Sequence, residues 1–441
     1  MLNDTICAIA TPDVMGAVSL IRISGEEAIE IAERLIGKDL SAVKGYSIVY
    51  GTIKDNGEPV DDVLVSVFRA PKSYTGEDVI ELGCHGGVYI THRILSLIIG
   101  QGARMARRGE FTQRAFLNGK MDLSQAEGVN DLINARDGNA ARSAMHSLKG
   151  SVSKILSPLI ENLTQIISNI EVNIDYPEYD DVHQMTEEEI IPMCQKWLVD
   201  IHRVIEKAQA SASIKDGIDT VILGRPNVGK SSLLNAMLEE DKAIVTDIEG
   251  TTRDIVEGTV RLDGITLNLI DTAGIRRSND VIEQMGIDRS LKALEKAQLV
   301  ILVLDATREM NEEDQKLLSM TEGRARIVVY NKNDQKQVDG ALSISARTGD
   351  IAPLVDAIKA MYEKELIASN TDTLNNERQI GLALQAESYM KDALASLQAG
   401  MEVDLVTIDL EKSWRALKEI TGEVGREDLL DEIFSRFCLG K

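Results

Sequence analysis

Residues 224–232 read GRPNVGKSS and match the phosphate-binding pattern G-x-x-x-x-G-K-[ST]. The apolar residues 220–223 precede this loop, and a helix-like pattern over residues 232–238 follows it. In such a setting glycines let backbone N–H groups close around phosphates, and the helix N-terminus adds partial positive charge. The stretch therefore predicts an α/β nucleotide-binding unit in which Lys230 reaches the outer phosphates and the Ser231 hydroxyl binds Mg²⁺.

Three further motifs follow predicted strands in an order that selects guanine. Asp271-Thr272-Ala273-Gly274 offers a carboxylate for Mg²⁺ and a glycine N–H for the γ-phosphate. In Asn331-Lys332-Asn333-Asp334, the last carboxylate can accept two hydrogen bonds from guanine, which adenine cannot supply. Ser345-Ala346-Arg347 is expected to contact the guanine O6 through its backbone. Four motifs in this order predict a GTP site.

The region around the second motif raises the question of how GTP is hydrolysed. Of Thr251 and Thr252, we favour Thr252 as the residue that closes on Mg²⁺. Ile275 stands where many GTPases have a glutamine that orients the attacking water, so another group is needed. Asn227 is a candidate ligand for a potassium ion, which would supply the positive charge that an arginine finger supplies in other GTPases. Alternatively, the Asn227 side chain simply stabilises the loop.

Composition bounds the class of protein. The 441 residues are enough for about three domains. With 48 Lys and Arg against 71 Asp and Glu, the net charge of −23 argues against a protein whose main task is gripping a nucleic-acid backbone. A local basic stretch either contacts RNA or forms a solvated face; its residues are Arg93, Arg104, Arg107, Arg108 and Arg114.

The sequence also carries signals of location. Its four cysteines show neither paired nor metal-like spacing, which favours a reducing compartment. The first residues, MLNDTICAIATPD, lack a basic start and a long apolar core, so no signal peptide is expected. No apolar run approaches the roughly 18 residues of a membrane span. We therefore expect a cytoplasmic protein.

Hydrophobic patterns predict a multidomain protein that combines α/β and all-α parts. Residues 1–118 are mixed, with strands expected at 18–23, 62–68 and 78–82 and helices at 26–36 and 88–100. Residues 119–216 and 369–441 are helical, and we expect them to build one bundle into which a GTPase unit with a mostly parallel sheet, residues 217–368, is inserted. Two helical faces are expected from apolar repeats: Leu123, Ala126, Val129, Leu132, Ile133, and Ile155, Leu159, Leu163, Ile166, Ile170.

Stretches outside the nucleotide motifs carry a resemblance that covers the whole chain. They include Ala10-Thr11-Pro12, Tyr74-Thr75-Gly76-Glu77-Asp78, His85-Gly86-Gly87, Gly250-Thr251-Thr252-Arg253-Asp254 and the terminal Cys438-Leu439-Gly440-Lys441. Ribosome-assembly GTPases share only the middle of this pattern. On these residues the chain resembles the MnmE family of tRNA modification GTPases, also called TrmE.

The resemblance implies a reaction and partners. The family adds aminomethyl-type groups, such as carboxymethylaminomethyl, to carbon 5 of the wobble uridine of certain tRNAs. It works in a heterotetramer with MnmG, a partner that uses FAD and NADH, and a 5-formyl- or 5,10-methylene-tetrahydrofolate supplies the one-carbon unit. The N-terminal domain resembles folate-binding modules and forms a homodimer. Arg22, Glu81, Lys120 and Lys441 would bind the folate. Without the resemblance, Arg22 and Glu81 would be interpreted as strand-face charges and Lys120 as a surface charge at a helix start.

The resemblance also assigns the cations and the hydrolytic water. Potassium would be held by Asn227, Thr251 and the backbone oxygens of Thr246 and Ile248, and Mg²⁺ by Ser231 and Thr252. Glu283 would position the water indirectly, or is a solvated helix charge. Motifs and resemblance together assign these residues to GTP: Asn227, Val228, Gly229, Lys230, Ser231, Ser232, Thr246, Asp247, Ile248, Glu249, Gly250, Thr251, Thr252, Asp271, Thr272, Ala273, Gly274, Asn331, Lys332, Asp334, Ser345, Ala346 and Arg347.

Two alternatives stay open at the sequence level. Cys438 is either an incidental terminal cysteine or a thiol that a flexible tail delivers to a catalytic site. The chain as a whole is expected to be a GTP-hydrolysing enzyme of tRNA modification, and the alternative is a regulatory GTPase of ribosome assembly. That alternative predicts a dedicated basic RNA-binding domain, which this acidic chain does not suggest.

Overall fold

A computed structural model describes most of the chain: residues 4–135, 138–175, 187–215, 217–240, 256–262, 265–270, 294, 296–362, 372–424, 430, 433–435, 437–438 and 440. The chain falls into two compact units. The first comprises Met1–Asn134, Ala144–Trp197 and Gln385–Lys441, and the second comprises Ala135–Ser143 and Leu198–Leu384. The second unit is therefore continuous apart from one short segment, and the first is assembled from both ends of the chain.

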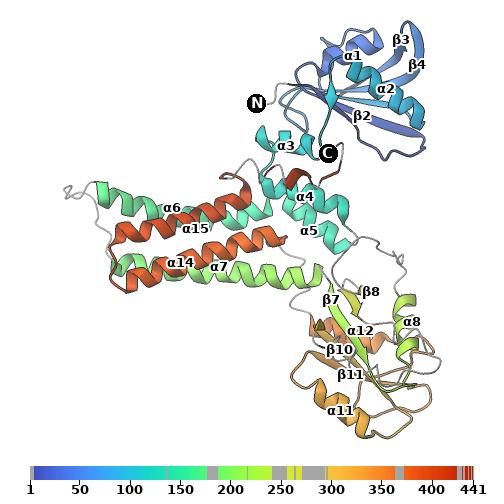
Figure 1. The fold of residues 1–441 in the computed structure, drawn as a ribbon, viewed down its shortest axis with the longest axis vertical. Coiled ribbons are helices and arrows are strands. Elements are labelled where there is room, and N and C mark those ends of the chain that lie inside the picture. Colours follow the sequence, from blue (N-terminus) through green and yellow to red (C-terminus); the bar gives the residue numbers. More distant parts are fainter. Residues whose placement is uncertain are drawn as a thin grey trace. The chain divides into compact units, whose positions relative to one another are not determined.

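A six-stranded sheet opens the first unit (Figure 1). Its strand order is β3-β4-β5-β2-β1-β6, and only the β1–β6 pair is parallel. The strands are β1 (Ile6–Ile9), β2 (Val18–Ser24), β3 (Ser47–Asp55), β4 (Glu58–Phe68), β5 (Val79–His85) and β6 (Arg104–Met105). Helices α1 (Ala28–Ile36) and α2 (Val88–Gly100) pack their apolar sides against one face and bury Ile31, Leu35 and Ile94 with the sheet.

Period-two alternation located part of this sheet correctly. The expected strands at 18–23, 62–68 and 78–82 and both expected helices are present, which confirms those predictions. β1, β3 and the short β6 were not predicted, and β4 begins earlier than expected. β3 was not recognised because its exposed positions carry apolar residues, Ile48 and Tyr50, where the alternating pattern of a half-buried strand would place polar ones.

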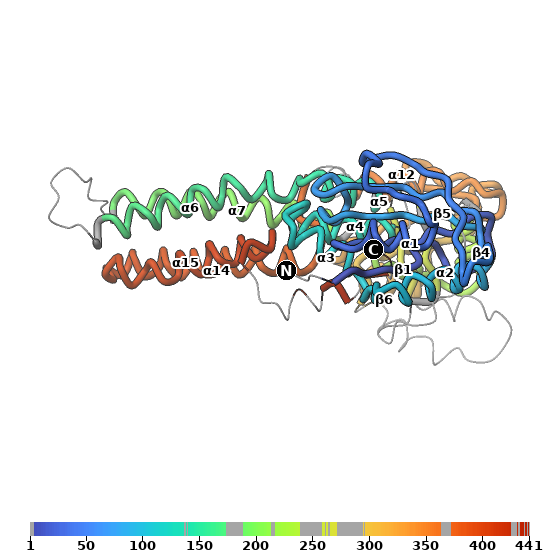
Figure 2. Tube along the Cα trace, turned by 90° about the horizontal axis from the view of Figure 1, so that it is seen from above, coloured from blue at the N-terminus to red at the C-terminus, as the bar shows by residue number. Residues whose placement is uncertain are grey.

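Helices make up the rest of the first unit, and some of them extend into the second. α3 (Glu110–Leu117) leads into α4 (Leu123–Asn134) and α5 (Gly138–Leu148), followed by α6 (Ser151–Asp175) and α7 (Glu187–Lys215); α14 (Glu377–Gln398) and α15 (Val403–Thr421) come from the end of the chain. Figures 1 and 2 together show α6, α7, α14 and α15 side by side. The all-α prediction for both flanks is confirmed.

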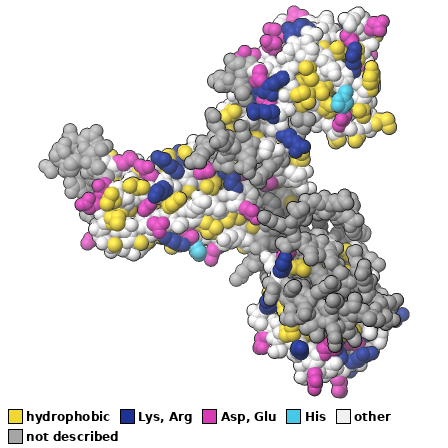
Figure 3. Space-filling model, in the orientation of Figure 1, with side chains coloured by type: hydrophobic (Ala, Val, Ile, Leu, Met, Phe, Trp, Pro, Cys, Tyr) yellow, Lys and Arg dark blue, Asp and Glu magenta, His cyan; other side chains and the backbone are white. Residues whose placement is uncertain are grey.

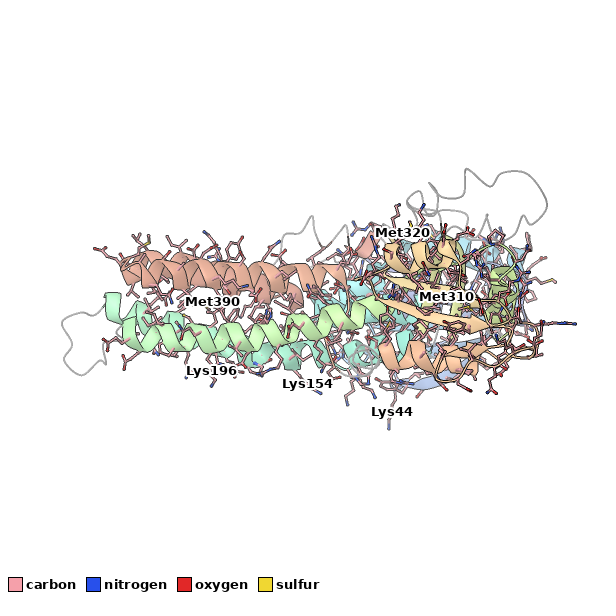
Figure 4. All side chains as sticks on the ribbon, turned by 90° about the horizontal axis from the view of Figure 1, so that it is seen from below. Lys44, Lys154, Lys196, Met310, Met320 and Met390 are labelled. Atoms are coloured by element: carbon pink, nitrogen blue, oxygen red, sulfur yellow. The ribbon has the colours of Figure 1, made fainter. Side chains whose placement is uncertain are left out.

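Polar contacts join the long helices in addition to apolar packing. Trp197 donates to the Leu159 carbonyl at 2.9 Å, and Ser413 donates to the Ala386 carbonyl at 2.8 Å. Met390, fully buried, lies on the side of α14 that faces α7 (Figure 4). The predicted apolar face of α6 is buried from Leu159 to Ile170, whereas in α4 Leu123 is buried and Ile133, expected on the same face, is 43% exposed.

The second unit contains the predicted, mostly parallel sheet. Its order is β12-β11-β10-β7-β9-β8, and only the β8–β9 pair is antiparallel. The strands are β7 (Ile218–Leu223), β8 (Val256–Leu262), β9 (Ile265–Ile270), β10 (Leu299–Asp305), β11 (Arg326–Asn331) and β12 (Ser343–Ile344). Helices α8 (Lys230–Glu240), α11 (Glu312–Met320) and α12 (Ala352–Met361) accompany it. Every β10 residue is buried, as expected for a central strand covered on both faces.

Within the described residues, no helix is both long enough and apolar enough to cross a membrane.

Candidate functional site

The phosphate-binding loop joins the carboxyl end of β7 to the start of α8. Gly224 and Gly229 have φ of +151° and +98°, values that favour glycine. A Cβ on Gly224 would collide with the Val303 carbonyl, and one on Gly229 would collide with the Asn331 amide. Asn227 is also left-handed, with φ of +64°, and its side chain is exposed. The predicted strand, loop and helix are therefore present, and the loop is bent tightly against two neighbouring strands.

Lys230 begins α8 and bonds to its own loop. Its Nζ donates to the carbonyl oxygens of Gly224 at 2.6 Å and Arg225 at 2.9 Å. Burial lowers the pKa of Lys230, while the nearby Glu313 carboxylate acts in the opposite direction. An ammonium group among carbonyls, partly removed from water, is suited to bind phosphate oxygens strongly.

Asn331 links the guanine motif to the phosphate loop and to the third motif. Its Nδ2 donates to the Val228 carbonyl at 2.9 Å, and its Oδ1 accepts the Ala346 N–H at 3.0 Å. One buried carboxamide therefore bridges two motifs that are more than a hundred residues apart. Asp334 accepts a hydrogen bond from the Ser345 hydroxyl at 2.7 Å, which orients the carboxylate expected to read guanine.

Lys332 makes a second bridge, and its acidic partner was missed at the sequence level. Its Nζ donates to the Asn227 carbonyl at 3.0 Å and to Asp305 Oδ2 at 2.6 Å. Burial acts to raise the pKa of Asp305, but hydrogen bonds from Lys332 and Thr307 outweigh it and hold that pKa at about 2. Asp305 ends the apolar run of β10, and a carboxylate at the carboxyl end of a parallel strand is the signal that could have revealed it.

The structure brings together the predicted residues of three motifs: Asn227, Val228, Gly229, Lys230, Asn331, Lys332, Asp334, Ser345 and Ala346. Ser231 and Ser232 follow in the first turn of α8, and Arg347 is exposed after the third motif. The expected switch residues Thr246–Thr252, the Asp271–Gly274 motif, Ile275 and Glu283 lie outside the described residues.

A second cluster lies on the N-terminal sheet, in the first unit. Arg22 and Glu81 stand opposite each other on β2 and β5 and form an ion pair with a 2.7 Å contact. The Arg22 guanidinium also lies 5.5 Å from the ring centres of Tyr74 and Phe111. Lys120 is separate from this pair, since its Nζ donates to the Pro71 carbonyl at 2.7 Å. The contacts therefore join two of the predicted folate residues, and Lys441 lies outside the described residues.

The C-terminal segment docks beside this cluster. Arg22 Nη1 donates to the Gly440 carbonyl at 3.2 Å, and the Gly109 N–H donates to the Cys438 carbonyl at 3.4 Å. Phe434 and Phe437 are buried with residues of α4, whereas the Cys438 thiol is exposed. The other three cysteines are buried, and burial raises the pKa of both Cys7 and Cys194 to about 11. The exposed terminal thiol thus belongs to a tail fixed on both sides.

Comparison with known proteins decides the family. The model of the MnmE helical domain matches residues 123–438, and that of the GTP-binding protein TrmE N-terminus matches residues 5–120. The tRNA modification GTPase MnmE of Pediococcus pentosaceus is 46% identical, with 99% of this chain and 98% of that protein covered. The chain belongs to the MnmE family.

Other comparisons agree in part. The tRNA modification GTPase MnmE of Geobacillus thermodenitrificans is 44% identical, with 99% of both chains covered. The solved FeoB G-domain of Methanococcus jannaschii is 24% identical, covering 33% of this chain and 98% of its own, but the TM-score of 0.24 is too low to bear on the fold. Membership over the full length does not favour the ribosome-assembly alternative, which shares only the GTPase unit.

Proposed function

We propose that this chain is a GTP-hydrolysing enzyme of tRNA modification. The observation that carries the proposal is the convergence of the phosphate loop, the guanine motif and the Ser345-Ala346 turn, in a member of the MnmE family. Asn331 and Lys332 tie these motifs into one site at the carboxyl ends of the strands, where nucleotides bind in sheets of this type. A ligand shifts the equilibrium between two conformations only if it binds them with different affinities. GTP and GDP would favour different conformations of this chain, so hydrolysis would drive a change from one to the other.

We propose that the chain acts on tRNA as the MnmE family does. The chain adds an aminomethyl-type group, such as carboxymethylaminomethyl, to carbon 5 of the wobble uridine. It acts in a heterotetramer with the FAD-dependent MnmG protein and takes a one-carbon unit from a tetrahydrofolate. Family membership supports these steps, and the acidic composition fits a protein that shares tRNA binding with a partner.

Two cations fit the residues of the phosphate loop. The Asn227 carboxamide is an exposed oxygen ligand at a left-handed turn, and the Ser231 hydroxyl stands in the first turn of α8. Both are ligands suited to hard cations. We assign potassium to Asn227, Thr246, Ile248 and Thr251, Mg²⁺ to Ser231 and Thr252, and water positioning to Glu283. When bound, potassium would supply positive charge that stabilises the transition state of GTP hydrolysis.

A folate fits the second cluster by its chemistry. Arg22 and Glu81 offer donors and acceptors to a pterin, and Tyr74 and Phe111 supply aromatic surface beside them. Lys120 and Lys441 would meet the acidic tail of the cofactor. Cys438 is proposed to act near this chemistry, because its segment is held by Arg22.

The N-terminal sheet also supports a homodimer. Ile48, Tyr50 and Leu64 are 67%, 56% and 53% exposed. Cross-strand register puts them on the same face as Arg22 and Glu81, because residues directly opposite one another share a face. Figure 3 shows hydrophobic side chains on the visible surface of this unit. An apolar surface of this kind is typical of an interface, and we propose that a second copy covers it.

The chain is proposed to have an inserted-domain organisation and a cytoplasmic location. We assign residues 1–118 to dimerisation and folate binding, 119–216 and 369–441 to one helical domain, and 217–368 to an inserted GTPase domain. The composition of the first unit from both ends of the chain supports the insertion. The exposed Cys438 and three buried free thiols suit a reducing cytoplasm.

Potassium dependence tests the nucleotide site directly. We expect the purified chain to hydrolyse GTP faster in potassium than in sodium salts, and Asn227→Ala to lose this stimulation while it still binds GTP. The backbone of Asn227, which Lys332 contacts, is retained in the variant, so binding should survive. An equal potassium response in both proteins would contradict the assignment of Asn227 to the cation.

A further inference from the structure

Arg225, the second residue of the phosphate loop, forms an ion pair with α11. Its Nε lies 2.8 Å from Oδ1 of Asp314, and the two side chains are 13% and 1% exposed. Asp314 also completes the cap of α11, since it accepts the Asn311 N–H at 3.2 Å and its own N–H donates to the Asn311 side chain at 3.1 Å. One buried carboxylate therefore joins the phosphate loop to the start of a helix.

The first turn of α11 approaches the phosphate loop in a second way. Glu313 lies close enough to Lys230 for its charge to favour the ammonium form. Lys230 in turn donates to the Arg225 carbonyl at 2.9 Å. Arg225 is therefore held at two points. Its side chain pairs with Asp314, and its carbonyl oxygen accepts a hydrogen bond from Lys230, the phosphate-binding lysine.

We propose that Arg225 is a positioning residue for nucleotide binding, and that its ion pair with Asp314 keeps the phosphate loop in a binding geometry. The inference rests on the GTP binding proposed for this loop. A loop already held in the bound shape loses less conformational freedom when the nucleotide arrives, so binding is tighter. Without Arg225 the Asp314 carboxylate would be buried with no countercharge, and the loop and helix start would rearrange to relieve it.

The test is the rate at which the full-length protein releases a fluorescent GDP when excess unlabelled GDP is added. We expect Arg225→Met and Asp314→Asn to release it about tenfold faster, a typical size for coupling between two sites. Arg225→Lys keeps the positive charge and should stay near the wild-type rate. Arg203→Met is the matched control, because its side chain is 74% exposed and pairs with Asp200 on α7, outside the phosphate loop and α11.

Steady-state hydrolysis separates positioning from chemistry. The KM for GTP should rise in Arg225→Met and Asp314→Asn while kcat changes little, because neither side chain is placed at the reacting atoms. The inference is overturned if both variants release GDP at the wild-type rate, even if they are less stable. If Arg225→Met does not fold, Asp314→Asn decides alone, since asparagine can still accept the cap hydrogen bond. Failure of the wild type to bind GDP would instead contradict the proposed function.

Discussion

Ion pairs and hydrogen bonds connect single residues at the nucleotide site. Asp305 is nearly buried and contacts both Lys332 and Thr307, and Lys332 in turn contacts the Asn227 carbonyl. This chain of contacts connects the guanine motif to the loop proposed to bind potassium. The Lys332 backbone is left-handed, with φ of +72°, a conformation that such contacts help to maintain.

Asp305 predicts a pH dependence of stability. Its pKa is about 2 in the folded chain and 3.8 in the reference state, so the carboxylate stabilises the fold above about pH 4 and loses this effect as pH falls toward 2. The shift corresponds to about 2 kcal/mol. Asp305→Asn should be less stable at neutral pH and lose less stability on acidification. Hydrogen exchange of β10 and β11 amides reports this unit alone, and equal pH profiles in both proteins would contradict the prediction.

The docking of the C-terminal segment depends on its close approach to the backbone just before α3. Gly109, just before α3, has φ of +68°, and a Cβ there would press on the Phe434 carbonyl and the Phe437 side chain. The docked tail therefore requires glycine at this position. Because Phe434 and Phe437 are buried, the tail should resist proteases that cleave after aromatic residues.

Gly109→Ala should undock the tail. We expect chymotrypsin to cleave after Phe434 and Phe437 several-fold faster than in the wild type, since cleavage follows the open population. Gly119→Ala is the control, because Gly119 has nearly the same φ, +67°, but an added Cβ would meet nothing within 4 Å. Backbone strain alone is present in both variants. Equal cleavage rates in the two would mean that the close approach at Gly109 does not hold the tail.

Some elements of the site and fold follow from the sequence, and others do not. Strand–loop–helix order and four spaced motifs predicted the nucleotide site, because phosphate and guanine binding demand fixed residue types at fixed spacing. The structure describes three of these motifs, and Asp271–Gly274 lies outside the described residues. Asp305 and the Arg225–Asp314 pair were missed. Asp305 and Asp314 lie outside any short motif, Arg225 occupies a position that the phosphate-loop pattern leaves open, and only the folded sheet brings these residues together. β3 was missed because its outward residues, Ile48 and Tyr50, are apolar, as expected if a partner covers them.

At the scale of the whole molecule, the proposed homodimer depends on the exposed face of β3 and β4. Tyr50→Glu with Leu64→Glu would put charges on that face, and we expect the double variant to be monomeric by light scattering. Both side chains are more than half exposed, so the monomer fold should survive. Met310→Glu with Met361→Glu, exposed positions in the second unit, should leave the dimer intact. A double β3–β4 variant that stays dimeric would place the interface elsewhere.

The central claim is that GTP bound by this chain drives tRNA modification. The most direct measurement is mass spectrometry of tRNA nucleosides from a strain that lacks the chain and is complemented with the wild type or with Asp334→Asn. The variant removes the carboxylate expected to read guanine, which should weaken GTP binding by at least about a hundredfold. GTP-driven modification predicts that aminomethyl-type wobble uridines disappear in the deletion strain and return only with the wild type. Unchanged wobble uridines in the deletion strain would contradict the claim.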